Sequence, residues 1–292
     1  MILEPGFFAS TPVQIALIVG GGAALVSGVV GVFAVLRGQS FAGHAFADIS
    51  SSGGAVSFLL GINPLLGFLG MAVIAAGGME LAGARLARER DLVTGIALGA
   101  GLGLTALLLY FDVTTRSTTG VAITVMFGSM FSIPASVIPL ALAVGGAALA
   151  VSAVLYRPLL LASLSPELAR VAGVRVRMIG LLQLLVLAFA VALSAVTVGA
   201  ILSTALLIGP AATALSLTDR PASAIAAAVA IGVGAVWGGI LLAYDSFYWT
   251  PGHGWPVSFF IVSLVFLFYL LATIQERRRK RRRKAAGCRG GS

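Results

Sequence analysis

Seven long stretches without an acidic or basic side chain constrain the fold of this 292-residue chain more than any other feature of its sequence. Residues 5–36, 49–79, 92–111, 117–156, 178–218, 221–244 and 246–275 contain no Asp, Glu, Lys or Arg. An α-helix needs roughly 20 apolar residues to cross the hydrocarbon core of a bilayer. Each stretch is long enough to cross once, and the longest could hold two crossings.

The composition places the chain among membrane proteins. Hydrophobic residues make up 59% of it and charged residues 10%, whereas soluble domains carry about 25% charged residues. Only Glu4 precedes the first apolar stretch, and no basic region does, so we expect no cleaved signal peptide. The predicted fold class is all-α, a helical bundle of about nine transmembrane helices.

Hydropathy and helix breakers place the nine predicted spans. They cover residues 13–35, 41–60, 64–84, 92–111, 135–156, 178–197, 200–217, 222–243 and 256–273. An odd number of spans puts the termini on opposite sides of the membrane. Of the 19 Lys and Arg residues, only Arg116 falls on one side, which leaves 18 on the other. Because basic residues favour the cytoplasm, we expect an inner or plasma membrane protein with its N-terminus outside and its C-terminus in the cytoplasm.

Two segments fall outside this pattern of spans. Residues 121–133 are apolar but too short to cross, so we interpret them as re-entrant or interfacial. Residues 1–274 form the predicted transmembrane domain, and residues 275–292 form a basic cytoplasmic tail. The tail sequence RRRKRRRK could bind nucleic acid in a soluble chain. After a membrane span we interpret it as an anchor that touches anionic membrane lipid, and we expect no nucleic-acid partner.

Several catalytic motifs are missing from the sequence. Its only lysines, Lys280 and Lys284, lie in the tail, so the chain has no GxxxxGK[ST] phosphate loop and can use ATP only through a partner. Neither a GxSxG nucleophile elbow nor a HExxH zinc helix is present. The single cysteine, Cys288, allows no intrachain disulfide. We therefore expect a membrane protein that is not an enzyme.

Three ionisable residues within the spans are candidates for a metal path. His44 and Asp48 lie four residues apart in the second span, so a helix places both on one face. Glu80 lies at a similar depth in the third span. Imidazole and carboxylate groups are common metal ligands, and charges within a membrane suggest a pathway or site. Alternatively, His44 and Asp48 bond only to each other, while Glu80 is solvated or pairs with Arg85.

Two further segments carry polar residues. On the outer side, Asp245 and His253 lie in a segment rich in Tyr, Trp, Pro and Gly, for which an aromatic belt with a turn is the simpler explanation. The connection 157–177 on the cytoplasmic side predicts a short helix, because Ser165 suits the N-cap, Pro166 and Glu167 suit the first turn, and Gly173 suits the end. This helix is either a structured loop or a docking site for a partner.

Parts of the sequence resemble a known family. The stretch GQSFAGHAFADISSSGGAVSFLLG, the pattern of Glu167, Ala169 and Gly173, and the segment VGAILSTALLIGPAATALSLTDRP are similar to the metal-chelate ABC-3 family. Its members are membrane permeases of ABC importers for zinc and manganese. The resemblance extends from the first span to Tyr269, and VGAILSTALLIGPAATA is its most specific part.

The resemblance implies a permease that forms a homodimer, works with a cytoplasmic ABC ATPase dimer and receives metal from an extracytoplasmic binding protein. It implies a transported divalent metal ion and no permanently bound cofactor. The metal ligands would be His44, Asp48 and Glu80, lining a path between two copies, although the family usually has Asp before His in the second span. The docking helix would comprise Ser165, Pro166, Glu167, Ala169 and Gly173, and Pro210 is a possible hinge.

Other functions remain open at this point. A proton-driven secondary transporter could use His44, Asp48 and Glu80 as a relay without any nucleotide. An intramembrane enzyme could use the same residues on a lipid or a metal-bound water. A permease for a siderophore or haem is a further alternative. Neither the metal nor the identities of the ATPase and the binding protein follow from the sequence.

Overall fold

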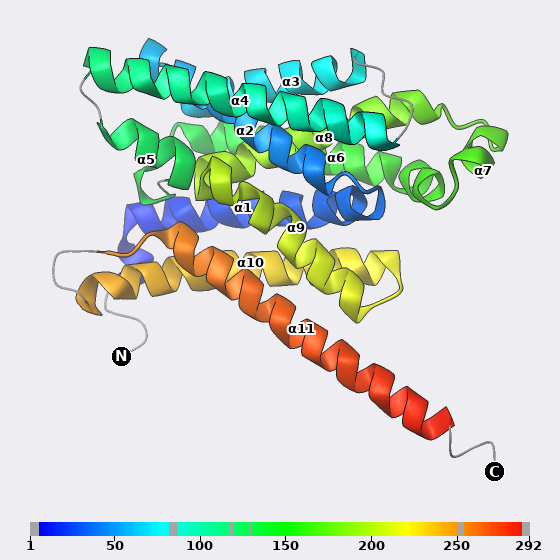
Figure 1. Ribbon diagram of the computed structural model, residues 1–292. Coiled ribbons are helices and arrows are strands. Elements are labelled where there is room, and N and C mark those ends of the chain that lie inside the picture. Colours follow the sequence, from blue (N-terminus) through cyan, green and yellow to red (C-terminus); the bar gives the residue numbers. More distant parts are fainter. Residues whose placement is uncertain (1–5, 82–86, 117–118, 129, 250–253, 288–292) are drawn as a thin grey trace.

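Every regular element that the computed structural model describes is a helix (Figure 1). The described residues are 6–81, 87–116, 119–128, 130–249 and 254–287. The elements are η1 (Phe7–Ala9), α1 (Thr11–Leu36), α2 (Ser40–Leu60), α3 (Pro64–Leu81), α4 (Ala87–Arg116), α5 (Thr119–Phe127), η2 (Met130–Ser132), α6 (Val137–Leu164), α7 (Pro166–Val171), α8 (Val176–Val198), α9 (Ala200–Leu217), α10 (Pro221–Trp249) and α11 (Val257–Gly287).

Each of the nine predicted spans coincides with one long helix, which confirms the all-α membrane fold. Eight of these helices are long and apolar enough to cross a membrane. The exception is α2, whose serines, glycines, His44 and Asp48 lower its hydropathy. Residues 82–84 of the third predicted span, His253 and residues 288–292 of the tail lie outside the described residues.

Some helices are longer than the predicted spans. α6 continues through Pro158 to Leu164, and α10 continues to Trp249. The extension of α10 includes Asp245, which is buried at 1% exposure. The segment expected to turn from Tyr244 onward is therefore helical as far as Trp249, because the helix takes up the first aromatic residues of that segment.

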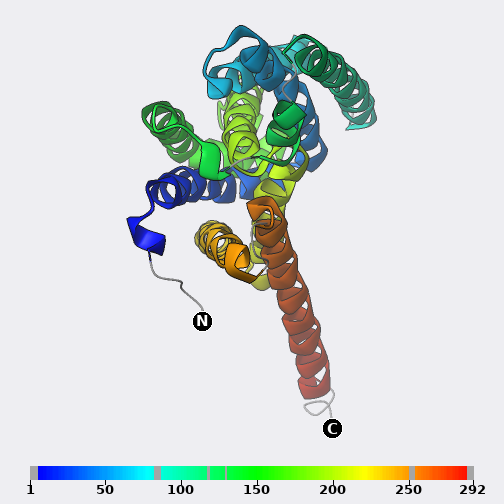
Figure 2. The same cartoon turned by 90° about the vertical axis from the view of Figure 1, so that its left-hand side faces the viewer.

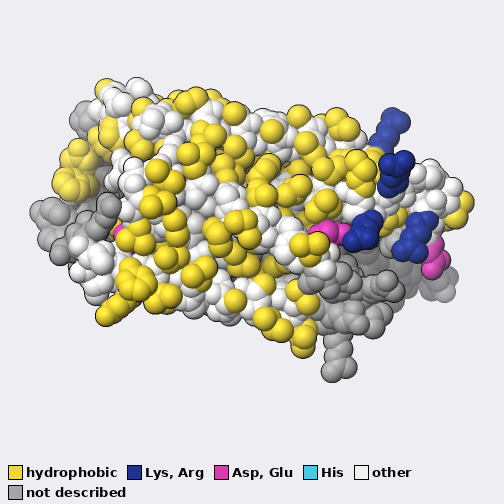
Figure 3. All heavy atoms as spheres, turned by 90° about the horizontal axis from the view of Figure 1, so that it is seen from above, with side chains coloured by type: hydrophobic (Ala, Val, Ile, Leu, Met, Phe, Trp, Pro, Cys, Tyr) yellow, Lys and Arg dark blue, Asp and Glu magenta, His cyan; other side chains and the backbone are white. Residues whose placement is uncertain are grey.

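The helices run back and forth between two ends of the bundle (Figure 1). α5 and the junction between α10 and α11 lie at one end, and α7 lies at the other. Figure 3 shows blue arginine side chains gathered near one end of an otherwise largely hydrophobic face. An end-on view places α3 and α4 at one edge and α10 and α11 at the opposite edge, with α1, α8 and α9 between them (Figure 2). α1 begins at the end of the bundle that holds α5, and α11 ends beyond the opposite end (Figure 1).

The apolar segment 121–133 forms two short helices instead of a span. α5 has nine residues, which extend ~14 Å at 1.5 Å per residue. Gly128 then takes a left-handed conformation, with φ 75°, and packs against Gly199. A side chain at either glycine would collide with the backbone of the other segment. This contact joins α5 to the junction between α8 and α9.

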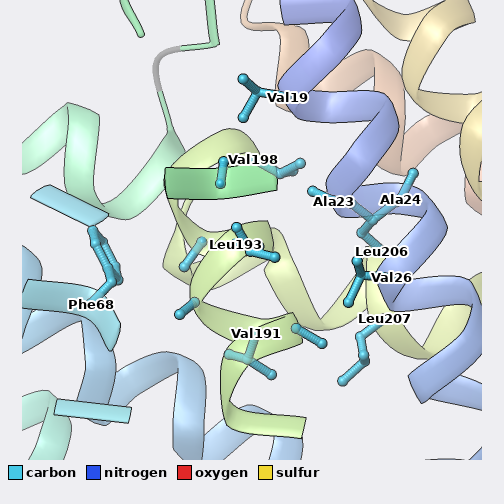
Figure 4. Close-up of a cluster of buried hydrophobic side chains, with 14 of the residues drawn as sticks. Val19, Ala23, Ala24, Val26, Phe68, Val191, Leu193, Val198, Leu206 and Leu207 are labelled. Atoms are coloured by element: carbon cyan, nitrogen blue, oxygen red, sulfur yellow. The ribbon is translucent and has the colours of Figure 1, made fainter. Parts of the chain in front are cut away.

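The main core lies where α1, α8 and α9 meet (Figure 4). Val26 of α1, Leu193 of α8 and Leu206 of α9 are each at least 97% buried there. Ser27 and Ser194 form a buried hydroxyl–hydroxyl hydrogen bond of 2.7 Å between α1 and α8. Lipid tails are as apolar as these side chains, so the helices associate through close van der Waals packing and interhelical hydrogen bonds.

Glycines allow the closest contacts between helices. α2 meets α3 where Gly53 faces Gly67, and a Cβ on either would collide with the backbone of the other. α4 meets α2 at Gly101, where a Cβ would lie 2.8 Å from the backbone nitrogen of Ile49. In contrast, a Cβ on Gly95, Gly99 or Gly103, which the glycine spacing assigns to a packing face, would meet nothing within 4 Å in the described structure.

The contact between α2 and α3 predicts a specific loss of stability. Gly53→Ala pushes a methyl group into the Gly67 backbone, and overpacking of this kind costs about 1–3 kcal/mol. We expect a lower midpoint of thermal unfolding for the full-length protein in detergent, followed by tryptophan fluorescence. Gly70→Ala is the control, because a methyl group there meets open space and favours the helix. Equal midpoints for both variants would contradict the contact.

Candidate metal-binding site

The helix that carries His44 and Asp48, α2, lies among other helices. It contacts α3, α4, α8 and α9, and Figure 1 shows it beneath α4. In a bilayer an ionisable side chain is stable only when it faces the protein interior or a water-filled cavity. The arrangement meets this requirement for Asp48, which is 3% exposed.

The structure brings His44 and Asp48 together on one face of α2. The His44 Nε2 atom lies 3.7 Å from Asp48 Oδ2, and the side chains are 41% and 5% exposed, respectively. This separation is too long for a hydrogen bond. Asp48 Oδ2 has no hydrogen-bond partner in the described structure. A buried carboxylate oxygen without a hydrogen-bond partner therefore lies beside a half-exposed imidazole.

The hydroxyl groups around Asp48 bond to the backbone and to each other. Ser51 donates to the Asp48 carbonyl at 2.6 Å, and Thr105 of α4 donates to the same carbonyl at 3.2 Å. Ser52 donates to the Ile49 carbonyl at 2.6 Å. These bonds satisfy the polar backbone of α2 and tie it to α4. They leave the Asp48 carboxylate available for a cation.

A residue that the sequence reasoning missed also contacts the pair. His44 Nδ1 lies 2.9 Å from the Thr204 hydroxyl of α9. The only sequence signal for Thr204 is a hydroxyl group in the apolar segment VGAILSTALLIGP. Hydroxyls in such segments usually bond to their own helix, so the pattern does not reveal a partner 160 residues away.

The third predicted ligand, Glu80, has a different partner. Its Oε1 atom accepts a hydrogen bond of 3.0 Å from Arg177 Nε of α8. The Glu80 side chain is 25% exposed and that of Arg177 is 85% exposed. No group of three or more His, Cys, Asp and Glu side chains placed to hold a metal occurs in the described part of the chain. The role of Glu80 as a ligand stays a prediction, and the alternative partner Arg85 lies outside the described residues.

The arrangement offers two protein ligands to a cation. Imidazole nitrogen suits transition metals, and a carboxylate supplies compensating negative charge. Two ligands leave most coordination positions of a divalent ion to water or to other groups. Such a site binds loosely enough to release its ion, which fits passage better than permanent storage.

The short helix α7 has the capping groups that the sequence predicts. The Ser165 hydroxyl accepts a hydrogen bond of 3.3 Å from the Leu168 backbone amide, and Gly173 ends the turn with φ 76°. Ala169 is buried, whereas the apolar residues Leu168 and Val171 are 62% and 86% exposed. An amphipathic helix with an exposed apolar face at the end of the bundle suits contact with another protein.

The possible hinge residue Pro210 lies in the second half of α9, which continues through it. Pro210 is buried, and its ring faces Gly232 of α10. Proline removes one backbone hydrogen bond from a helix, so α9 is weakest at this point. Its role in bending stays a prediction.

Known proteins resemble the chain over almost its whole length. The model of the ABC 3 transport family matches residues 10–274. The manganese transport system membrane protein MntC of Listeria innocua is 29% identical over 94% of this chain and 96% of its own. The high-affinity zinc uptake system membrane protein ZnuB of Haemophilus influenzae is 28% identical over 79% of this chain and 88% of its own.

A solved structure has a similar fold. PsaBC from Streptococcus pneumoniae in complex with Fab superposes with a TM-score of 0.78 at 26% identity. The superposition covers 91% of this chain and 92% of the other.

The exposed pair of Glu80 and Arg177 predicts a weak interaction. Exposed ion pairs contribute about 0.2–1 kcal/mol and weaken as salt rises. We expect a double-mutant cycle of Glu80→Gln and Arg177→Gln, measured by thermal unfolding, to give a coupling energy in this range that falls in high salt. Arg175→Gln is the control, because it removes an exposed charge two residues away. A coupling energy several times larger would contradict a reversible contact.

Proposed function

Because the chain belongs to the ABC 3 transport family, we propose that it is the permease subunit of an ABC importer that moves a divalent transition-metal ion into the cytoplasm. Manganese and zinc are the leading substrates, since these metals appear in the names of relatives similar over most of the chain. A separate ATPase supplies the energy. The metal is cargo and not a resident cofactor.

The observation that carries this proposal is the His44–Asp48 pair within the membrane. A buried carboxylate oxygen without a hydrogen-bond partner is costly in a low-dielectric environment. A passing cation would offset that cost, and the neighbouring Nε2 atom would supply a second ligand. The site thus favours a partly dehydrated metal ion over a neutral molecule.

Glu80 supplies the next contact on the proposed path. In the described state its carboxylate holds the guanidinium of Arg177. An inward-moving metal ion competes with this guanidinium for the same oxygen atoms. Because the ion pair is exposed and weak, the metal ion can displace the guanidinium at little cost in free energy. A second copy of the chain would complete the path and supply further ligands.

The basic end of the bundle is the proposed cytoplasmic end. Arg170 lies on α7 and Arg177 lies in the first turn of α8, and Figure 3 shows arginine side chains gathered near one end. α7 then faces the ATPase with Glu167 exposed in its first turn. The opposite end, with α5, faces an extracytoplasmic binding protein. Motion of α7 would pass directly to α8, which begins five residues after α7 ends.

The ligand proposal predicts that Asp48→Ala or Glu80→Ala abolishes metal uptake. Each substitution removes a carboxylate from the path but leaves α7 unchanged, so the ATPase should still copurify. The measurement is accumulation of radioactive Mn²⁺ and Zn²⁺ in host cells whose own copy has been deleted. Ser52→Ala is the control, since it alters a buried α2 hydroxyl that bonds only to its own helix. Normal uptake by both carboxylate variants would refute the path, and uptake driven by a proton gradient without ATP would refute the importer.

The docking proposal predicts that Glu167→Lys releases the ATPase. Reversing the charge of an exposed residue in a contact places like charges together, and each 1.4 kcal/mol lowers affinity about tenfold. We expect the affinity of the permease for the ATPase to fall at least about tenfold, so that less ATPase copurifies with it. The midpoint of thermal unfolding of the permease should stay unchanged. Asp219→Lys, the same change at an exposed carboxylate between α9 and α10, is the control. Retained association in Glu167→Lys would count against docking through α7.

A further inference from the structure

Resting on the function proposed above, we propose that Thr204 is a positioning residue that holds the His44 ring with its Nε2 atom turned toward Asp48, where both side chains can bind the metal. The proposal starts from two facing contacts of one imidazole. Thr204 lies 2.9 Å from Nδ1, and the open carboxylate of Asp48 lies 3.7 Å from Nε2.

The chemistry of a neutral imidazole links these two contacts. One ring nitrogen carries a proton and the other carries a lone pair. A metal ion between His44 and Asp48 needs the lone pair on Nε2, so the proton must reside on Nδ1. The Thr204 hydroxyl oxygen then accepts the hydrogen bond from Nδ1–H. In the other tautomer the same hydroxyl donates to Nδ1, so it holds the ring in the same orientation. Without the hydroxyl, the ring loses this contact on its Nδ1 side and Nε2 can turn away from Asp48.

The packing of α9 holds the Thr204 hydroxyl in place. Leu207, one turn further along α9, is fully buried. Its side chain lies against Gly43 of α2, next to His44, and its backbone carbonyl lies against Gly31 of α1. These contacts fix how α9 faces α2. Thr204 therefore reaches the imidazole from a neighbouring helix whose position is set independently of His44.

Outer partners of metal-binding histidines have measurable effects. Such partners fix the tautomer and ring orientation, and their removal typically weakens metal binding 10–100-fold. Thr204→Val keeps the shape of the side chain and removes only the hydroxyl. We expect the affinity for Zn²⁺ and for Mn²⁺ to fall by about 10–100-fold. Thr204→Ser keeps the hydroxyl and should restore it.

The tautomer can be observed directly because the chain has only two histidines. The full-length protein, labelled with ¹⁵N-histidine and held metal-free in lipid nanodiscs, gives two sets of ring signals by NMR. His253→Gln removes one set and identifies His44. On addition of Zn²⁺ we expect a protonated Nδ1 and a metal-bound Nε2 in the wild type and in Thr204→Ser, and a weaker metal-bound Nε2 signal in Thr204→Val at the same Zn²⁺ concentration.

The matched control is Thr213→Val, the same substitution on the same helix. The Thr213 hydroxyl bonds to the Gly209 carbonyl of its own helix, so its removal should change neither the tautomer nor the affinity. A wild type that keeps the proton on Nε2 after addition of Zn²⁺ would overturn the proposal. So would a Thr204→Val protein with the wild-type tautomer and affinity, or an equal loss in Thr213→Val.

The same set of variants separates this inference from the proposed function. Calorimetry with Zn²⁺ on His44→Ala tests the metal site itself. If that variant binds as tightly as the wild type, the proposed metal role of His44 fails and the metal-binding role of Thr204 fails with it. If His44→Ala loses binding while Thr204→Val keeps both tautomer and affinity, Thr204 alone is refuted.

Discussion

The burial of a carboxylate inside a membrane-spanning bundle is the constraint on which the rest of the structure depends. Asp48 is stable in the membrane only because α3, α4, α8 and α9 surround α2 and keep lipid away. That requirement explains why α2, which carries Asp48, has many neighbouring helices. It also explains why Ser51 and Ser52 donate their hydroxyls to the backbone of α2: each bond satisfies a polar group that lipid cannot satisfy.

Close approach between helices makes this enclosure possible. Apolar side chains gain little by leaving lipid, so the bundle depends on contact distance, and glycines at Gly53 and Gly101 let α3 and α4 lie directly against α2. Thr105 uses the same short distance to bond to the backbone of α2. The surface of α2 that packs against α4 therefore also receives the hydrogen bond from Thr105. The interior that stabilises the fold is also the interior through which the proposed substrate passes.

Local sequence signals predict much of this molecule and miss what lies between helices. Charge-free stretches locate nine long helices, and the cap at Ser165 and the end at Gly173 follow from side-chain chemistry within one turn. The spacing of His44 and Asp48 places them on one face. The contacts of Thr204 and Arg177 depend on how α9 and α8 are rotated against their neighbours. The spacing of residues within one helix does not predict that rotation. Likewise, the glycine repeat at Gly95 and Gly99 gives no hint that the close contact is at Gly101.

Gly199 alone links α8 to α9, so this end of α9 would be the pivot of any tilt of the helix. With only Gly199 between α8 and α9, and α5 packed against it, that end has no slack. At 1.5 Å per residue, Thr204 lies ~7.5 Å from the pivot and Leu217 lies ~27 Å from it. Any tilt of α9 moves Leu217 about three to four times as far as Thr204. A tilt about Gly199 would therefore displace the end of α9 near the basic end of the bundle far more than the hydroxyl that contacts His44.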